Sequence, residues 1–159
     1  MKIVHTNGSN KDFYKICEAL DVSLNANAPG RKEAGLNSLY DIENIKDVFL
    51  LYKDGIVIGS AGLWQHCAEV CELIRVFVLD EHRGNGYVGL LAEKVEELAK
   101  SKGYNKIKLR TWSSTPYAVR AYEKLGYSEV TASKAGIKDK FARALALSGF
   151  RVFMEKEIK

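Results

Sequence analysis

The sequence has no long apolar run, and its first residues lack the features of a secretion signal. No stretch approaches the ~18 consecutive apolar residues that a membrane-spanning helix needs. Residues 1–8 become polar at once, without the apolar core and small-residue cleavage site of a signal peptide. We therefore expect a cytoplasmic protein that does not interact with membranes.

Cysteine is scarce, and the few cysteines present do not form a metal-binding motif. Cys17, Cys67 and Cys71 are odd in number, and their spacing matches no zinc or redox pattern. Such cysteines are usually small, buried side chains that stay reduced. We expect no bound metal.

Charge of one sign is not concentrated anywhere in the chain. The net charge is +4, but lysine and arginine are spread along the sequence and alternate with acidic residues. A nucleic-acid-binding domain would carry its positive charge in a cluster or a stripe. We therefore expect no nucleic-acid partner, whereas a mildly basic surface suits a small ligand that carries phosphates.

The composition that remains is that of an ordinary globular domain. The chain has 159 residues, of which 47% are apolar and 28% charged, close to globular averages. This length falls within the range of one domain. We expect residues 1–159 to form a single domain with one active site.

Strand and helix patterns follow one another along the chain. We expect strands at residues 2–6, 47–53, 56–64, 70–79, 106–112, 127–131 and 151–158, and helices at 11–20, from the glycines near 86 to about 102, and from 116 to about 125. Asp54-Gly55 favours a tight hairpin, and Thr115-Pro116 favours an N-cap followed by proline in the first helical turn. Residues 21–38 are expected to be an irregular loop, and residues 133–148 have no assigned role.

A glycine-rich stretch lies between an expected strand and an expected helix. Residues 84–89 match G-x-G-x-x-G, the dinucleotide-binding pattern, but such a site also needs an acidic residue at the end of the next strand, and residues 107–111 offer none. A nicotinamide-dependent dehydrogenase is therefore disfavoured. Glycines before a helix still expose successive N–H groups, with the helix dipole behind them, to an anion such as a pyrophosphate.

The same stretch, taken from Arg83, resembles the acetyl-CoA motif of the GNAT superfamily of N-acetyltransferases. Residues 72–78 are similar to that family's central strand, and residues 118–127 are similar to its second motif. The resemblance covers about residues 48–130. It implies an α/β (α+β) fold with a mixed, mostly antiparallel twisted sheet, a splayed central strand and helices on both faces. It also implies acetyl-CoA as the co-substrate.

The resemblance assigns cofactor-binding roles to individual residues. By this likeness the pantetheine arm would bind the main chain at Val76, Phe77 and Val78, and Thr115 stands where the second motif often has asparagine. The phosphates would be held by the loop residues Arg83, Gly84, Asn85, Gly86, Tyr87, Val88 and Gly89. Tyr122 matches the tyrosine near the CoA sulfur, where it would protonate or hydrogen-bond the departing thiolate. Its alternative role is to pack a helix against the sheet.

An acceptor amine with a pKa near 10 is almost wholly protonated at neutral pH, so a base is expected. Glu72 is the leading candidate because it interrupts an otherwise apolar strand, where an unpaired charge is costly. The alternative is an ion pair with a neighbouring cation such as Arg75. Glu69 and His66 are weaker candidates.

Acceptor recognition is indicated only by position and polarity. Arg31, in the polar segment, is a candidate for binding an acceptor carboxylate, and Trp64 is a candidate wall of the acceptor site. We expect transfer to the amine of a small molecule or an amino acid. A protein or peptide amine, a non-catalytic acyl-CoA-binding regulatory module and a homodimer remain open.

Overall fold

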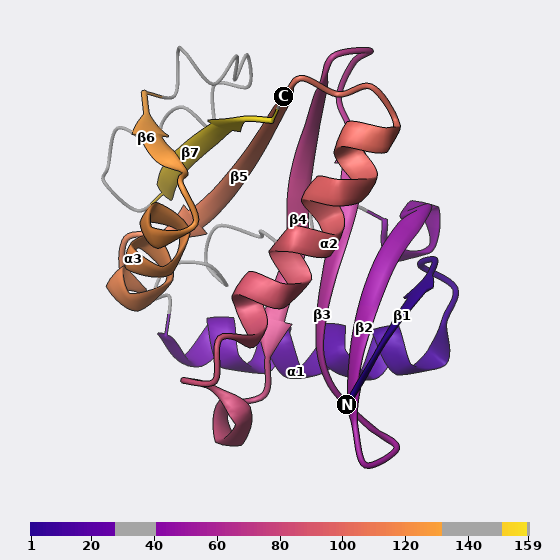
Figure 1. The fold of residues 1–159 in the computed structure, drawn as a ribbon. Coiled ribbons are helices and arrows are strands. Elements are labelled where there is room, and N and C mark those ends of the chain that lie inside the picture. Colours follow the sequence, from indigo (N-terminus) through magenta and orange to yellow (C-terminus); the bar gives the residue numbers. More distant parts are fainter. Residues whose placement is uncertain (28–40, 132–150, 159) are drawn as a thin grey trace.

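The computed structural model describes residues 1–27, 41–131 and 151–158. Its strands form one sheet in the order β1-β2-β3-β4-β5-β7-β6 (Figure 1). The strands are β1 (Lys2–Thr6), β2 (Asp47–Lys53), β3 (Ile56–Gln65), β4 (Val70–Val78), β5 (Lys106–Trp112), β6 (Ser128–Val130) and β7 (Arg151–Glu157). All neighbouring strands pair antiparallel except β4 and β5, which are parallel. The expected mixed, mostly antiparallel sheet is confirmed.

Helices lie on both faces of the sheet, as expected. The helices are α1 (Lys11–Asn27), α2 (Tyr87–Ser101) and α3 (Pro116–Lys124), with short 3₁₀ turns at Ile42–Asn44 and Asp80–His82. In Figure 1, α1 crosses behind the sheet and α2 runs in front of it, while α3 lies beside β5. Within the described ranges, none of the helices has the length and apolar character needed to cross a membrane.

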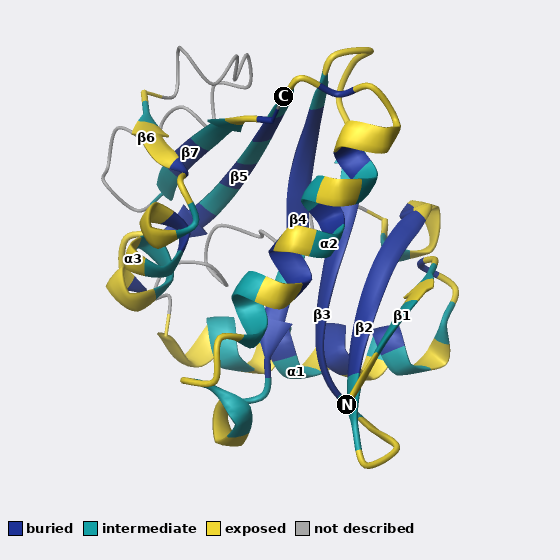
Figure 2. Ribbon diagram, in the orientation of Figure 1, coloured by how far each residue is buried: buried dark blue, intermediate teal, exposed yellow. Residues whose placement is uncertain are grey.

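Apolar clusters on both faces of the sheet hold these layers together. On the α2 face, Leu91 and Val95 are fully buried against strand residues such as Leu73, because they recur on one side of the helix. On the α1 face, Phe13 packs against Ile74. Figure 2 shows the resulting dark blue band along β2, β3 and β4. Strand β4 is therefore buried on both faces, as its apolar sequence predicted.

Helix α1 is longer than the sequence pattern predicted. It continues to Asn27, so the expectation of a loop was wrong for residues 21–27. Leu24 follows Leu20 at helical spacing, and both pack in the cluster beside Phe77. The nearest helix breaker is Pro29-Gly30, which lies outside the described residues.

The tight turn between β2 and β3 forms as predicted. Asp54 and Gly55 both have positive φ, at 51° and 81°. Such a conformation suits the twist of a two-residue hairpin. The turn fixes the register of β3, which in turn positions β4.

Strands β4 and β5 separate after a short paired segment. Their parallel pairs are Val70 with Lys106, Cys71 with Ile107 and Glu72 with Lys108. Beyond Glu72 the two strands diverge, which Figure 1 shows as a V that opens towards α1 and the first turn of α2. The splayed central strand is thus confirmed.

A bulge in β4 follows the point of separation. The register with β3 shifts between Ser60 and Gly62, and Arg75 has a φ of 52°. The Ser60 hydroxyl, which is fully buried, donates to the Arg75 carbonyl at 2.9 Å and so fixes the bulge. Bulges of this kind redirect main-chain groups away from the regular ladder.

Candidate active site

A cavity of about 970 Å³ occupies the V between β4 and β5. Its walls come from the end of β4, the loop before α2, helix α3, the end of β5 and the last turns of α1. In open α/β sheets, ligands bind at the carboxyl ends of parallel strands, and this cavity lies at the carboxyl ends of β4 and β5. Most of the residues that the sequence singled out meet here.

The glycine loop forms one end of the cavity. Gly84 and Gly86 have φ of 79° and 75°, and a Cβ at either position would meet nothing within 4 Å. Gly86 is the N-cap of α2 and supplies no side-chain cap. The first helical hydrogen bond is donated by the Leu90 N–H to the Gly86 carbonyl at 3.2 Å. The earlier N–H groups of the helix are therefore available to an anion.

Those N–H groups belong to Tyr87, Val88 and Gly89, and all three residues line the cavity. The Val88 side chain is half-buried and packs against the α2-face cluster.

Arg83 and Asn85 differ in their relation to the cavity. Arg83 lines it, donates from Nε to the Val78 carbonyl at 3.1 Å and pairs with Asp80 at 2.7 Å. Asn85 does not line it, because its side-chain amide donates to the carbonyls of His82 and Arg83 at 3.0 and 3.1 Å. Asn85 thus stabilises the loop from outside.

The main chain of β4 forms the wall of the V. Val76, Phe77 and Val78 line the cavity just after the bulge. Arg75 is half-buried as a whole while its side chain is only 7% exposed, so its main chain contributes to the exposed surface. The bulge therefore presents peptide groups to the cavity.

Helix α3 contributes Tyr122 to the cavity, and Thr115, which directly precedes the helix, also lines it. Tyr122 is buried, lines the cavity, and burial raises the pKa of its phenol above the usual value, so the neutral form is favoured. Thr115 is the N-cap and Pro116 begins the helix, as predicted, but the Thr115 side chain makes no capping hydrogen bond. Its hydroxyl instead donates to the Trp112 carbonyl at 2.8 Å.

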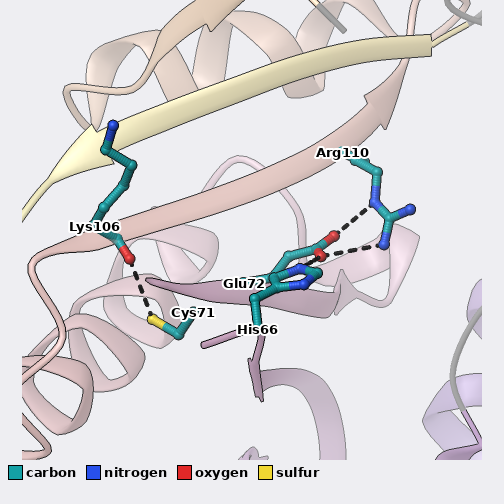
Figure 3. Close-up of polar contacts among 5 residues, drawn as sticks. All are labelled: His66, Cys71, Glu72, Lys106 and Arg110. Atoms are coloured by element: carbon teal, nitrogen blue, oxygen red, sulfur yellow. Dashed lines mark hydrogen bonds and ion pairs between the residues drawn. The ribbon is translucent and has the colours of Figure 1, made fainter. Parts of the chain in front are cut away.

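Glu72 lies at the apex of the V and is engaged by two neighbours (Figure 3). Its side chain is 5% exposed and accepts from Arg110 Nε at 2.7 Å and from Arg110 Nη2 at 3.1 Å. His66 Nε2 lies 2.5 Å from Glu72 Oε2, the oxygen that also accepts from Arg110 Nη2, and His66 itself is exposed. The suggested partner Arg75 was wrong, because Arg75 pairs with Asp21.

The structure does not bring every predicted residue to the cavity. Trp64 lies opposite Glu72 in the β3–β4 register, but it packs against the α1-face cluster and does not line the cavity. Glu69 is exposed in the turn before β4. Arg31 lies outside the described residues.

Sequence reasoning missed most of the cationic residues around the cavity. The lysine and arginine residues that line it are Arg75, Arg83, Arg110, Arg120, Lys124 and Arg151. The Arg151 guanidinium also lies 4.3 Å from the Trp112 ring centroid. Among the described residues that line the cavity, Glu72 is the only acid. A signal for Arg110 existed, because alternation places it on the same face of β5 as Lys108, the partner of Glu72.

Comparison with solved structures shows the same fold in other acetyltransferases. An acetyltransferase from Streptococcus agalactiae aligns over 98% of both chains with a TM-score of 0.77 and 18% identity. A GNAT family acetyltransferase from Elizabethkingia anophelis, solved with acetyl-CoA bound, aligns over 70% of this chain and 75% of its own, with a TM-score of 0.55 and 20% identity.

Sequence comparison adds a curated relative and a family. An uncharacterized N-acetyltransferase of Chlorobaculum tepidum is 30% identical over 89 residues, which are 56% of this chain and 54% of the relative. The chain thus spans about half the length of the curated relative it matches. The model of the acetyltransferase (GNAT) family matches residues 14–127, well over half of the chain. Since that match includes the splayed strands, the glycine loop and α3, this chain belongs to the acetyltransferase (GNAT) family.

Proposed function

We propose that the chain is an acetyl-CoA-dependent N-acetyltransferase that transfers an acetyl group to a primary amine of a small molecule or an amino acid. The observation that carries this proposal is the cavity itself. It connects exposed N–H groups at the start of α2 with the buried Tyr122 and the bulged main chain of β4. Family membership and the acetyl-CoA-bound relative support the choice of cofactor.

Acetyl-CoA binding follows from these groups. The pyrophosphate accepts hydrogen bonds from the N–H groups of Tyr87, Val88 and Gly89, with the helix dipole behind them. Arg83 adds a charge-assisted contact to a phosphate oxygen. The pantetheine amides extend along the main chain at Val76–Val78, as an added strand would, with Thr115 across the cleft.

The transfer step is a direct attack in a ternary complex. The neutral amine attacks the thioester carbon, and an N–H of Val76 or Phe77 stabilises the oxyanion. The intermediate collapses by breaking the carbon–sulfur bond, which releases the CoA thiolate, and the nitrogen loses a proton to solvent to leave a neutral amide. Tyr122 donates its phenolic hydrogen bond, and finally its proton, to that thiolate.

Glu72 is our candidate for the base. It lines the cavity and takes a proton from the acceptor ammonium before or during attack. Arg110 holds the carboxylate in place through two hydrogen bonds. His66 contacts the same carboxylate and is 42% exposed, so it links Glu72 to solvent.

Isothermal titration with acetyl-CoA, together with a free-CoA release assay over a panel of amines, tests the proposal. We expect binding, and CoA release that requires an amine. Binding without release on small amines or peptides would favour a regulatory acyl-CoA-binding module. Faster release with peptides than with small amines would favour a protein acetyltransferase. Absence of binding would contradict our assignment of the loop at 83–89.

A further inference from the structure

Arg75 combines a buried charge with an unfilled donor. Its side chain is 7% exposed, and Nη1 contacts the Asp21 carboxylate at 3.2 Å. Its Nη2 is buried without a hydrogen-bond partner among the described residues. A buried guanidinium nitrogen that lacks an acceptor carries a desolvation cost. A ligand that supplied an acceptor there would remove that cost.

The position of Arg75 connects it with the reacting end of the cavity. It lines the cavity together with Leu20, Ser23 and Leu24 of α1. It also directly precedes Val76, at which we place the oxyanion contact. We therefore place a group held by Arg75 on the same side of the cavity as the thioester carbon, in the part of the acceptor that surrounds its amine.

The charges of the cavity separate into two groups. Arg83, Arg120 and Lys124 come from the glycine loop and α3, where we place the phosphates. The strands supply Arg75, Arg110 and Arg151, and the only acid that lines the cavity in the described chain is Glu72. Both Glu72 oxygens already accept from Arg110. Arg75 contacts Asp21 through Nη1, so its Nη2 is a buried donor at the strand end that still lacks an acceptor within the described chain.

We infer that the acceptor is a small α-amino-acid-like zwitterion, whose carboxylate is bound by Arg75 and whose amine lies towards Glu72. This inference rests on the proposed function and narrows its substrate class. A carboxylate presents two acceptor oxygens to a guanidinium, and one of them would accept the hydrogen bond that Nη2 lacks. The opposite charges make this hydrogen bond stronger than one to a neutral acceptor. A polyamine or another dication would place further positive charge beside a buried arginine, which is unfavourable.

The test compares L-amino acids with their own carboxamides in the free-CoA release assay. Each pair has the same side chain and an amine at the same place, and the amide lacks the carboxylate. Loss of that charge also lowers the pKa of the amine, which by itself would speed transfer to the amide. For the best amino acid, we expect kcat/KM to exceed that of its amide at least tenfold. This comparison uses the unmodified protein, so it does not depend on whether a variant folds.

The variant Arg75→Gln tests whether Arg75 causes the preference for the amino acid over its amide. We expect it to lower kcat/KM for the amino acid to the level of the amide, mainly through KM, while the Kd for acetyl-CoA stays unchanged. Arg75→Lys should restore part of the preference. Lys94→Gln, which removes one positive charge from the exposed Lys94–Glu97 pair on α2, should retain the full preference.

The outcomes separate this inference from the proposed function. Equal or faster transfer to the amides would overturn the carboxylate inference and leave the transferase intact. No transfer to either series, with acetyl-CoA still bound, would overturn it as well. Failure to bind acetyl-CoA would remove the proposed function together with the inference.

Discussion

Tyr122 and Tyr127 contact each other edge to face, with 5.9 Å between ring centroids, but only Tyr122 lines the cavity. The Tyr127 hydroxyl instead donates to Glu96 at 3.0 Å, and Lys156 contacts the same carboxylate at 2.7 Å. The two phenols therefore allow chemistry and packing to be tested separately.

Removing the Tyr122 hydroxyl should affect the reaction. For Tyr122→Phe we expect kcat to fall by about 10²-fold, within the range for loss of a general acid, with little change in the Kd for acetyl-CoA. Tyr127→Phe should keep kcat and lower the free energy of unfolding by about 1–2 kcal/mol, because it removes one hydrogen bond to a carboxylate. Steady-state kinetics and urea unfolding measure both effects. Equal kcat values for the two variants would reduce Tyr122 to a packing residue.

Glu72 serves two roles in our account, as a base and as the partner of Arg110. If it is the base, the reaction of Glu72→Gln should depend on the small fraction of acceptor that is already neutral. Below the amine pKa of about 10, log(kcat/KM) should then rise with a slope near 1 per pH unit. The unmodified enzyme should show a flatter profile. A purely structural Glu72 would lower stability in this variant while leaving the slope unchanged.

At the scale of elements, helix α2 has a glycine in the left-handed backbone conformation at each end. The two glycines differ in whether they line the cavity. Gly86 precedes the helix and lines the cavity, whereas Gly103 follows it at a φ of 85°, and a Cβ at either would meet nothing within 4 Å. Substitution by alanine therefore imposes the same kind of backbone strain, about 1–2 kcal/mol, at both ends.

Only one of these substitutions should affect cofactor binding. We expect Gly86→Ala to raise the Kd for acetyl-CoA at least tenfold, because the strained loop shifts the N–H groups of the first turn. Gly103→Ala should lose similar stability and keep its affinity. Titration calorimetry and chemical unfolding on both variants provide the measurement. If both variants lost affinity equally, the effect would come from general destabilisation.

The elements that the sequence predicted well are those whose signals are local. Hairpin residues, β-rich runs and the glycines around α2 act through neighbours in the chain, so their bounds came close to the observed ones. The glycine loop followed from residue types at short spacing, and Tyr122 followed from the resemblance to a family motif. The end of the cavity that they line was therefore predictable.

The other end of the cavity depends on contacts between distant segments. Arg110 meets Glu72 only because of the parallel register of β4 and β5, and Arg75 turns to Asp21 because of a bulge and the added turns of α1. Neither the strand register nor the bulge can be predicted from a single sequence. Trp64 illustrates the same limit, since it lies opposite Glu72 in the register but its side chain packs against the α1-face cluster and does not line the cavity.

At the scale of the whole molecule, several weakly acidic groups are buried. Burial raises the pKa of the Cys17 thiol to about 11 and that of Cys71 to about 12, and it also raises the pKa of Tyr122. In the unfolded chain these thiols titrate near 9. The folded state therefore keeps its protons to higher pH than the unfolded state does.

This difference predicts alkaline instability. As pH rises above about 9, the unfolded chain binds fewer protons, so the free energy of unfolding falls, by about 1.4 kcal/mol per pH unit for each such thiol until its folded pKa is reached. Below about pH 8 both states hold these protons, and the thiols contribute no pH dependence. Urea unfolding at pH 8 and pH 10.5 measures the loss, and Cys71→Ala should reduce it. Equal stability at the two pH values would refute the expectation.

The strand order has a consequence for the time course of synthesis. Strand β7, the last described strand of the chain, lies between β5 and β6 and supplies the pairing partner of both. While a ribosome is still translating, one edge of β5 stays without its partner until Arg151–Glu157 emerges. An unpaired edge of this kind is open to pairing with other chains. The side of the cavity that carries Arg110 thus matures last, and a nascent chain completes its glycine loop well before its acceptor end.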